Sequence, residues 1–151
     1  MQILTQPLTK TGDFMFTPHP LLVKDCVTVA ELAVSSVLLS RDANYPWYIL
    51  VPRVEGAREI HHVHLDMQYQ IYAESAQLAA AIEKLHNPDK LNIAALGNMV
   101  AQLHIHHIGR FENDAAWPAP VWGRVEPSQY SENLLDQRAA EMAAELARSI
   151  F

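Results

Sequence analysis

Two histidines and a glutamine alternate with apolar residues in the stretch Gln102-Leu103-His104-Ile105-His106. Because side chains alternate between the two faces of a β-strand, this spacing predicts one polar row formed by Gln102, His104 and His106. Leu103 and Ile105 are expected to face the core. Imidazole and amide groups in a row on an apolar strand offer no packing advantage. They indicate a site for phosphate chemistry or for a metal.

Composition restricts the kind of protein that carries this stretch. The chain has 151 residues, of which 50% are hydrophobic and 19% charged, as is typical of one globular domain. Its formal net charge of −6 argues against binding a nucleic acid polymer, but not against one nucleotide in a pocket. The single cysteine, Cys26, fits a reducing compartment. The start of the chain lacks a signal-peptide pattern and no apolar run is long enough for a bilayer, so we expect a cytoplasmic protein without membrane contact.

The elements that must position the polar row are predicted from periodicity and turn residues. Four segments have the apolar content of strands, namely residues 33–40, 47–51, 91–96 and 100–108. The first two form a hairpin, and a tight turn at Gly97-Asn98 joins the last two.

Helical spacing predicts a long helix over 65–86 and a final helix over about 131–150, with Ser131 as its N-cap. A short helical turn is expected over 20–26, after an N-terminal arm over 1–17. The order of strands and helices implies a mostly antiparallel α+β domain.

The stretch 102–106 resembles the signature of the histidine triad (HIT) family, His-x-His-x-His followed by apolar residues, with glutamine in the first position. The likeness extends to the strings PWYILVPR, DKLNIAALGNMVAQLHIH and AWPAPVWG, which together resemble a bacterial subgroup that carries glutamine first. It implies a single HIT-like domain over 1–151 with its core at about 30–123. The implied fold has a mostly antiparallel sheet of about five strands, a long helix and a C-terminal helix.

The resemblance also implies a function. It predicts a nucleotide phosphohydrolase or nucleotidyl transferase that cleaves at the α-phosphate of a nucleotide derivative through a covalent nucleotidyl-histidine. Dinucleoside polyphosphates and nucleoside phosphoramidates are candidate substrates. By position, His104 corresponds to the nucleophile and His106 to the third histidine, with Gln102 in place of the first. The turn Gly97-Asn98, and less closely Asn92, correspond to groups near the phosphate.

The family's homodimer is implied as well, and no cofactor is required beyond a divalent cation such as Mg²⁺ as a counter-ion of the nucleotide. The helix over 65–86 and an edge of the sheet are candidate surfaces for that dimer, because an unprotected edge strand invites pairing.

The chemistry of the residues themselves agrees with these roles. A neutral imidazole can attack phosphorus if its other ring nitrogen donates to an acceptor that fixes the tautomer. For His104 we expect a backbone carbonyl or a nearby polar group to be that acceptor. His106 is expected to donate to the phosphate or to the leaving group. The Gln102 amide cannot transfer a proton and should orient instead, while Asn98 donates to a non-bridging oxygen.

Two departures from the family pattern leave alternatives open. Gln102 replaces the first histidine, and Trp47 or Tyr48 stands where the family often has a histidine at the start of its second strand. A nucleotide-binding module with little turnover is therefore one alternative. A cupin-type metal protein is another, although Gly97 and Glu112 are each one residue out of the register that a cupin strand needs.

Several other residues have simpler expected roles. His107 is expected to pack or to lie at the surface, and Arg110 to be a surface charge or to steer phosphate. The remaining histidines and tryptophans that attract notice are expected in a solvated turn and as anchors of the C-terminal segment, respectively: His61, His62 and His64, and Trp117 and Trp122.

Overall fold

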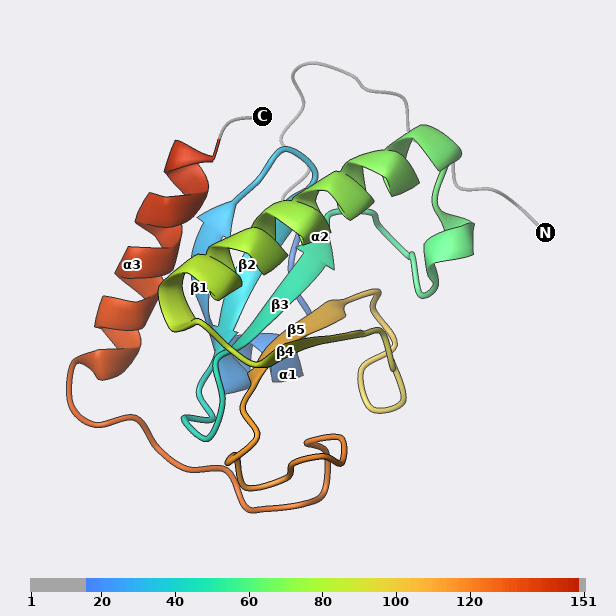
Figure 1. Ribbon diagram of the computed structural model, residues 1–151. Coiled ribbons are helices and arrows are strands. Elements are labelled where there is room, and N and C mark those ends of the chain that lie inside the picture. Colours follow the sequence, from blue (N-terminus) through green and yellow to red (C-terminus); the bar gives the residue numbers. More distant parts are fainter. Residues whose placement is uncertain (1–15, 150–151) are drawn as a thin grey trace.

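The chain folds into one antiparallel sheet with helices on both of its faces (Figure 1). The structure is a computed structural model that describes residues 16–149. In chain order its elements are α1 (Pro20–Asp25), β1 (Cys26–Glu31), β2 (Ser35–Ser40), β3 (Trp47–Pro52), the short 3₁₀ helix η1 (Ile60–His62), α2 (Leu65–His86), β4 (Lys90–Ala94), β5 (Ile105–Arg110) and α3 (Leu134–Arg148).

The sheet has five strands in the order β1-β2-β3-β5-β4, and every neighbouring pair is antiparallel. The predicted α+β class with a mostly antiparallel sheet is therefore confirmed. Strand β1 was not predicted from the sequence. It lies at one edge of the sheet, and its pairing with β2 is interrupted by a bulge between Thr28 and Ala30.

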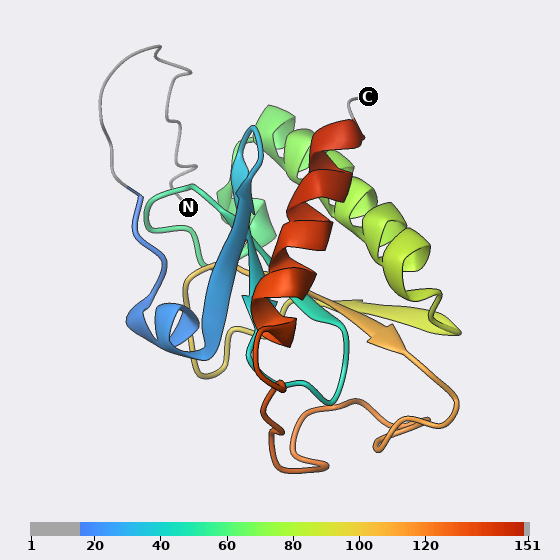
Figure 2. The same cartoon turned by 90° about the vertical axis from the view of Figure 1, so that its left-hand side faces the viewer.

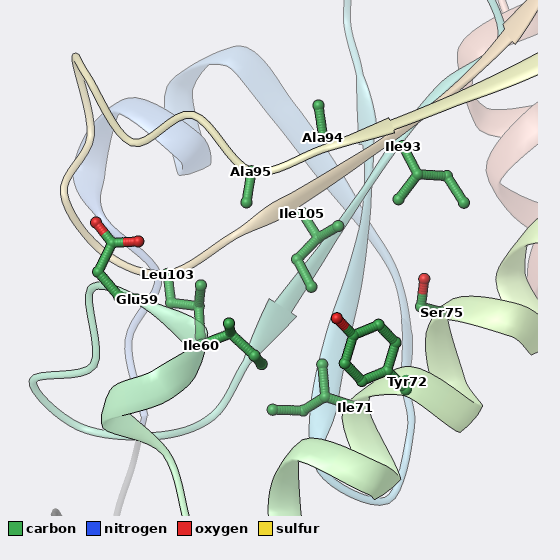
Figure 3. Close-up of a pocket in the computed structure, with 10 residues that line it drawn as sticks. All are labelled: Glu59, Ile60, Ile71, Tyr72, Ser75, Ile93, Ala94, Ala95, Leu103 and Ile105. Atoms are coloured by element: carbon green, nitrogen blue, oxygen red, sulfur yellow. The ribbon is translucent and has the colours of Figure 1, made fainter.

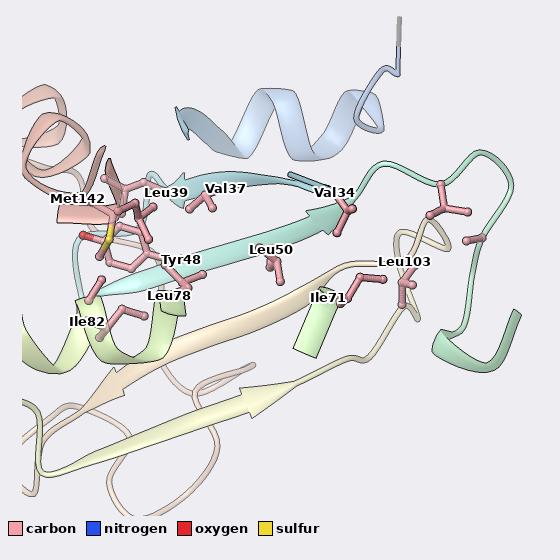
Figure 4. Packing of buried hydrophobic residues seen from close by; sticks show 14 of the residues in the cluster. Val34, Val37, Leu39, Tyr48, Leu50, Ile71, Leu78, Ile82, Leu103 and Met142 are labelled. Carbon is pink, nitrogen blue, oxygen red and sulfur yellow. The ribbon is translucent and has the colours of Figure 1, made fainter. Parts of the chain in front are cut away.

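Helices α2 and α3 lie on one side of the sheet, and the short helix α1 lies on the other (Figure 2). The larger apolar core fills the space between the sheet and the two long helices (Figure 4). Its buried members include Val37, Leu39, Tyr48, Leu50, Ile71, Leu78, Ile82 and Met142. Burial of these side chains is the main favourable contribution to the stability of this layer.

The predicted strand over 100–108 is displaced in the structure. Strand β5 begins only at Ile105, and it continues to Arg110. Ahead of it, the Leu103 amide donates to the carbonyl oxygen of Ala57 at 2.9 Å, and not to a neighbouring strand. The physical reason is that β4 ends at Ala94, so residues before Ile105 have no sheet partner on that side. The polar row on one strand is therefore wrong for Gln102 and His104.

The long helix is confirmed over the full predicted range 65–86. The final helix begins at Leu134, later than predicted, and Ser131 is not its N-cap. Asn133 occupies the N-cap position in a left-handed conformation without a capping side-chain hydrogen bond. The predicted arm over 1–17 and the predicted helix end at residue 150 lie largely outside the described residues. None of the described helices is both long and apolar enough to cross a membrane.

Candidate active site

The face of the sheet that points away from α2 and α3 carries a second apolar cluster and His106. His104 lies next to His106, just before β5. In the pairing of β3 with β5, Ile49 lies opposite His106. Ile49 belongs to a cluster of buried residues that reaches across the sheet to α1, comprising Leu22, Cys26, Leu38, Ile49, Val51 and Val100. Leu22, Cys26 and Leu38 also line a pocket of about 280 Å³ beside β1 and β2.

His104 is buried, at 6% exposed, and lies immediately before β5. Its Nδ1 is 2.7 Å from the backbone carbonyl oxygen of Gln102. A carbonyl oxygen only accepts, so Nδ1 is the protonated nitrogen of this ring. The neutral ring therefore has its lone pair on Nε2, and Nε2 has no partner among residues 16–149. An imidazole in this state can act as a nucleophile.

His106 is the second imidazole of the site, at 8% exposed, and its ring centroid lies 4.9 Å from that of His104. The indole Nε1 of Trp47 donates to His106 Nδ1 at 2.9 Å. Trp47 and Trp122 both meet the His106 ring edge to face, with centroids 5.6 and 5.2 Å away. Burial, assisted by the neighbouring His104 and His107, lowers the pKa of His106 to about 4. The ring is therefore neutral near pH 7.

The side-chain amide of Gln102 makes no hydrogen bond to either imidazole. Its Oε1 accepts from the backbone N–H of His19 at 2.7 Å, and its Nε2 donates to the carbonyl oxygen of Thr17 at 3.2 Å. The side chain thus holds the segment before α1. Only its backbone serves the site, through the carbonyl that binds His104.

Asn92 lies on β4 opposite Ile108, two residue pairs away from the pairing of Ala94 with His106 and on the same face of the sheet. Its Oδ1 accepts from Nη1 of Arg110 at 2.7 Å. This bond fixes the orientation of the amide, because only the oxygen can accept from a guanidinium. The Asn92 NH₂ group has no partner among the described residues and is left as a donor on the face of His106.

The predicted tight turn between the last two strands is wrong, because a ten-residue connection over 95–104 joins β4 and β5, and Gly97 and Asn98 lie within it. Gly97 has a φ of +74°, the left-handed region in which glycine carries no steric penalty. Asn98 is exposed and makes no hydrogen bond to the histidine pair in the part of the chain that the structure describes. The structure therefore brings His104 and His106 together, with Asn92 on the same face of the sheet, and the Asn98 amide makes no hydrogen bond within residues 16–149.

Arg110 is a residue whose role the sequence did not reveal, since it is 1% exposed and not a surface charge. It binds both carboxylate oxygens of Asp114 at 2.7 and 3.0 Å, and donates to the carbonyl oxygen of Ala119. Burial alone would raise the pKa of Asp114, but hydrogen bonds from Arg110 and from backbone amides outweigh it and lower that pKa to about 2. This ion pair anchors the segment that carries Trp122.

Trp122 packs against Trp47 and His106, as expected of an anchor, whereas the Trp117 side chain is exposed, with the Arg110 guanidinium 5.7 Å from its ring. Trp47 could have been found as a site residue from its place at the start of a strand beside the His-x-His stretch. The predicted solvated turn of histidines contains η1 and the N-cap of α2, where His64 Nδ1 accepts from Asp66 N–H at 3.4 Å. Within residues 16–149, no three His, Cys, Asp or Glu side chains gather in a way that could hold a metal ion.

The comparisons with known proteins agree with this architecture. The sequence profile of the HIT domain family matches residues 22–113. A histidine triad protein from Marinobacter aquaeolei VT8 is 42% identical, with a TM-score of 0.85 over 90% of this chain and 99% of that one. One from Bradyrhizobium japonicum is 40% identical, with a TM-score of 0.82 over 90% and 98%. No curated protein matches the sequence.

A third histidine triad protein, from Sinorhizobium meliloti 1021, is 33% identical, with a TM-score of 0.82 over 92% of this chain and 100% of that one. The chain therefore belongs to the histidine triad family. Its open sheet with helices on both faces is the HIT fold and not the closed β-architecture of a cupin, which removes the basis for the cupin alternative.

Proposed function

We propose that this protein is a nucleotide phosphohydrolase or nucleotidyl transferase that acts through a covalent bond between His104 and the α-phosphate of a nucleotide derivative. The observation that carries the proposal is the hydrogen bond from His104 Nδ1–H to the Gln102 carbonyl oxygen, 2.7 Å long. It leaves the lone pair of His104 on Nε2, beside the ring of His106. Membership of the histidine triad family supports the nucleotide as the ligand.

The proposed reaction has two displacements. The Nε2 lone pair of His104 attacks the α-phosphorus, the P–N bond forms, and the bond to the leaving group breaks with its electron pair on the leaving group. The ring becomes cationic, and the Gln102 carbonyl stabilises the proton that stays on Nδ1. Water then attacks phosphorus, the P–N pair returns to Nε2, and one proton is released. In a transfer reaction another nucleophile takes the place of water.

Donors around the histidine pair would hold the non-bridging oxygens as charge develops on them. His106 and the free amide of Asn92 lie on the same face of the sheet. We assign the Asn98 amide and the backbone of Gly97 to the same task, because their connection leads directly into His104. We assign the nucleobase to the pocket beside Leu22, Cys26 and Leu38, whose volume of about 280 Å³ can hold a planar heterocycle.

The proposal is tested by trapping the intermediate. Purified wild-type protein and His104→Ala are incubated with nucleotides labelled at the α-phosphate, quenched in base and examined for acid-labile label on protein. We expect label on the wild type and none on the variant. Label that persists in His104→Ala would contradict the proposal. Binding of a nucleotide without any label or product would support the alternative of a binding module with little turnover.

We further propose that no resident cofactor is needed and that Mg²⁺ enters only with the nucleotide. The nucleophile that the proposal requires is supplied by His104 itself. Labelling with a singly charged nucleotide ester should therefore persist after EDTA treatment, and its loss would contradict this part of the proposal. We also propose the cytoplasm as the compartment, which is supported by the free thiol of buried Cys26.

A homodimer is the proposed assembly, with the outer edge of β4 and the adjoining face of α2 as its interface. Large apolar side chains are exposed there, namely Leu65, Tyr69, Tyr72 and Ile93. Tyr72 and Ile93 also border a pocket of about 210 Å³ between α2 and the sheet (Figure 3). Exposed apolar patches beside an unpaired strand edge favour association.

The proposed dimer is tested by analytical ultracentrifugation. Sedimentation of the wild type should show a dimer that the Ile93→Lys substitution dissociates and the control Val125→Lys does not. A monomeric wild type would contradict the proposal.

A further inference from the structure

The hydrogen bond from Trp47 determines what His106 can do for a substrate. The indole Nε1–H is a donor only, and it reaches His106 Nδ1 at 2.9 Å. Nδ1 is therefore the acceptor of the His106 ring, and the proton of the neutral ring is on Nε2. This is the opposite tautomer from His104, whose proton is on Nδ1. Two adjacent imidazoles thus present a lone pair and an N–H, respectively.

A neutral imidazole that donates from Nε2 can hydrogen-bond an oxygen, but it cannot give that proton away without becoming an anion. To act as an acid, His106 would first have to be protonated on Nδ1, where the Trp47 N–H already points. Trp47 and Trp122 also enclose the ring. Burial opposes protonation of His106 as well, and the neighbouring His104 and His107 add to this by repulsion.

The other residue of the triad frame offers no proton either. Gln102 does not titrate, and both ends of its amide are bound to the backbone at Thr17 and His19. His104 keeps its one proton on Nδ1, which donates to the Gln102 carbonyl oxygen while Nε2 attacks. Among the described residues, the triad frame therefore contains a nucleophile and a hydrogen-bond donor, and no group poised as an acid.

We propose that Trp47 is a positioning residue that fixes His106 as an Nε2–H donor, and that the site consequently selects nucleotide anhydrides over nucleoside phosphoramidates. The inference rests on the proposed function. When the P–O bond of an anhydride breaks, the pair departs on a phosphate oxygen that is stable without a proton. When the P–N bond of a phosphoramidate breaks, the amine must receive a proton, and general acid catalysis of that kind is worth about 10²- to 10⁴-fold.

The substrate class is tested with leaving groups of graded basicity on one nucleotide. Aryl esters of adenosine 5′-monophosphate with different phenols should be cleaved with a steep dependence of kcat/KM on the pKa of the phenol. A dinucleoside polyphosphate should exceed the matched alkyl phosphoramidate by at least about 100-fold in kcat/KM. A flat dependence, or equal rates for the two substrates, would overturn the inference while leaving a His104 intermediate intact.

The role of Trp47 is tested without any substrate. Nitrogen NMR of ¹⁵N-histidine-labelled protein should show His106 with a proton on Nε2. Replacing Trp47 alone by the isosteric 3-benzothienylalanine removes the N–H and keeps the ring. Loss of one hydrogen bond should shift the tautomer ratio of His106 by roughly 3- to 10-fold. The same isosteric replacement at Trp122 is the matched control, because Trp122 touches the ring but makes no hydrogen bond to it.

In the active protein, the Trp47 replacement should also make the leaving-group dependence less steep, whereas the same replacement at Trp122 should leave its slope unchanged. A His106 tautomer ratio that does not change on this replacement would overturn the role of Trp47. A tautomer that shifts while the slope stays the same would overturn the link to substrate class. Absence of His104-dependent label would instead contradict the proposed function. The NMR result would still test the role of Trp47 independently.

Discussion

His106 and His107 are consecutive on β5, and they lie on opposite faces of the same sheet. Burial is the main cause that lowers the pKa of each ring to about 4. Their hydrogen bonds differ. His107 uses both nitrogens, because Nδ1–H donates to the Ile105 carbonyl oxygen and Nε2 accepts from Ser75 Oγ. His106 uses only Nδ1, which accepts from Trp47, and its Nε2 has no partner among residues 16–149.

His86, at the end of α2, repeats the pattern of His107. Burial, assisted by Arg138, lowers its pKa to about 4, and its two nitrogens are bound to Arg138 and to Tyr48 Oη. A lowered pKa therefore does not separate a reactive histidine from a structural one in this protein. Among the three buried histidines, an unoccupied ring nitrogen does, because His104 and His106 each have one within residues 16–149 and His107 has none.

The largest expected effect comes from removing the free nitrogen of His106. His106→Phe keeps a ring between Trp47 and Trp122 but removes the donor to the phosphate. Loss of one such donor should lower kcat by about 10²- to 10³-fold. Steady-state kinetics on the substrate that labels His104 measure the loss, and near-ultraviolet circular dichroism checks the fold. A variant with wild-type kcat would show that the free nitrogen has no catalytic use.

His107→Phe is the matched change on the other face, and it should act on stability. The substitution leaves the Ser75 hydroxyl without its buried partner, which costs about 1–3 kcal/mol of unfolding free energy. Urea denaturation measures this cost. Turnover per folded molecule should change far less than in His106→Phe. If His107→Phe were the more damaging variant for kcat, the distinction between the two faces would be wrong.

Acid should weaken the fold through the histidines that are buried in the neutral state. Their pKa is about 4 in the folded protein and near 6.5 in the unfolded chain, so the unfolded chain binds more protons between these values. Stability is complete above about pH 6.5 and falls as the pH drops toward 4, by up to about 1.4 kcal/mol per pH unit for each histidine.

His86→Gln isolates one of these contributions. Urea denaturation at several pH values across that window should show a slope smaller than that of the wild type by up to about 1.4 kcal/mol per pH unit. An unchanged slope would mean that His86 is already protonated in the fold or does not titrate there. In either case His86 would not be a buried neutral histidine of the same kind as His107.

The smallest effect is expected at Gln102, whose side chain is hydrogen-bonded to the backbone ahead of α1 and not to the imidazoles. Gln102→Ala removes two hydrogen bonds, and we expect a loss of about 1–2 kcal/mol of unfolding free energy. The carbonyl that binds His104 is unaffected, so base-stable label on His104 should remain. Complete loss of labelling in this variant would give the Gln102 amide a direct role in the reaction.

The sequence predicted elements best where one periodic pattern extends over many residues. The helix at 65–86 was predicted to the residue, because apolar residues recur along six turns and Asn87 ends it in a left-handed conformation. Strand β1 was missed because a bulge breaks its alternation after Thr28. The start of β5 was misplaced because the length of a strand depends on its partner, which ends at Ala94.

The site was predictable in its residue types and less so in their contacts. The His-x-His spacing brought His104 and His106 together correctly, although only His106 lies on a strand. The tautomer of His106 depends on Trp47, which is 59 residues away in sequence, and the engagement of Gln102 depends on residues 17 and 19. Contacts between segments so distant in sequence follow from the fold and leave no local pattern.

The Gln102 side chain binds the backbone of residues 17 and 19, and we call this pair of hydrogen bonds the Gln102 clamp. The clamp restricts the number of residues before α1 more than their identity. Its bonds are made to the carbonyl of residue 17 and the N–H of residue 19, atoms that nearly every amino acid supplies. The sequence at position 17 can therefore vary among related chains without loss of the clamp. A deletion between position 17 and Leu22 would move the wrong peptide groups to Gln102 and draw Leu22 out of the apolar cluster beneath α1. Insertions and deletions, more than substitutions, should be excluded from this segment as such proteins diverge.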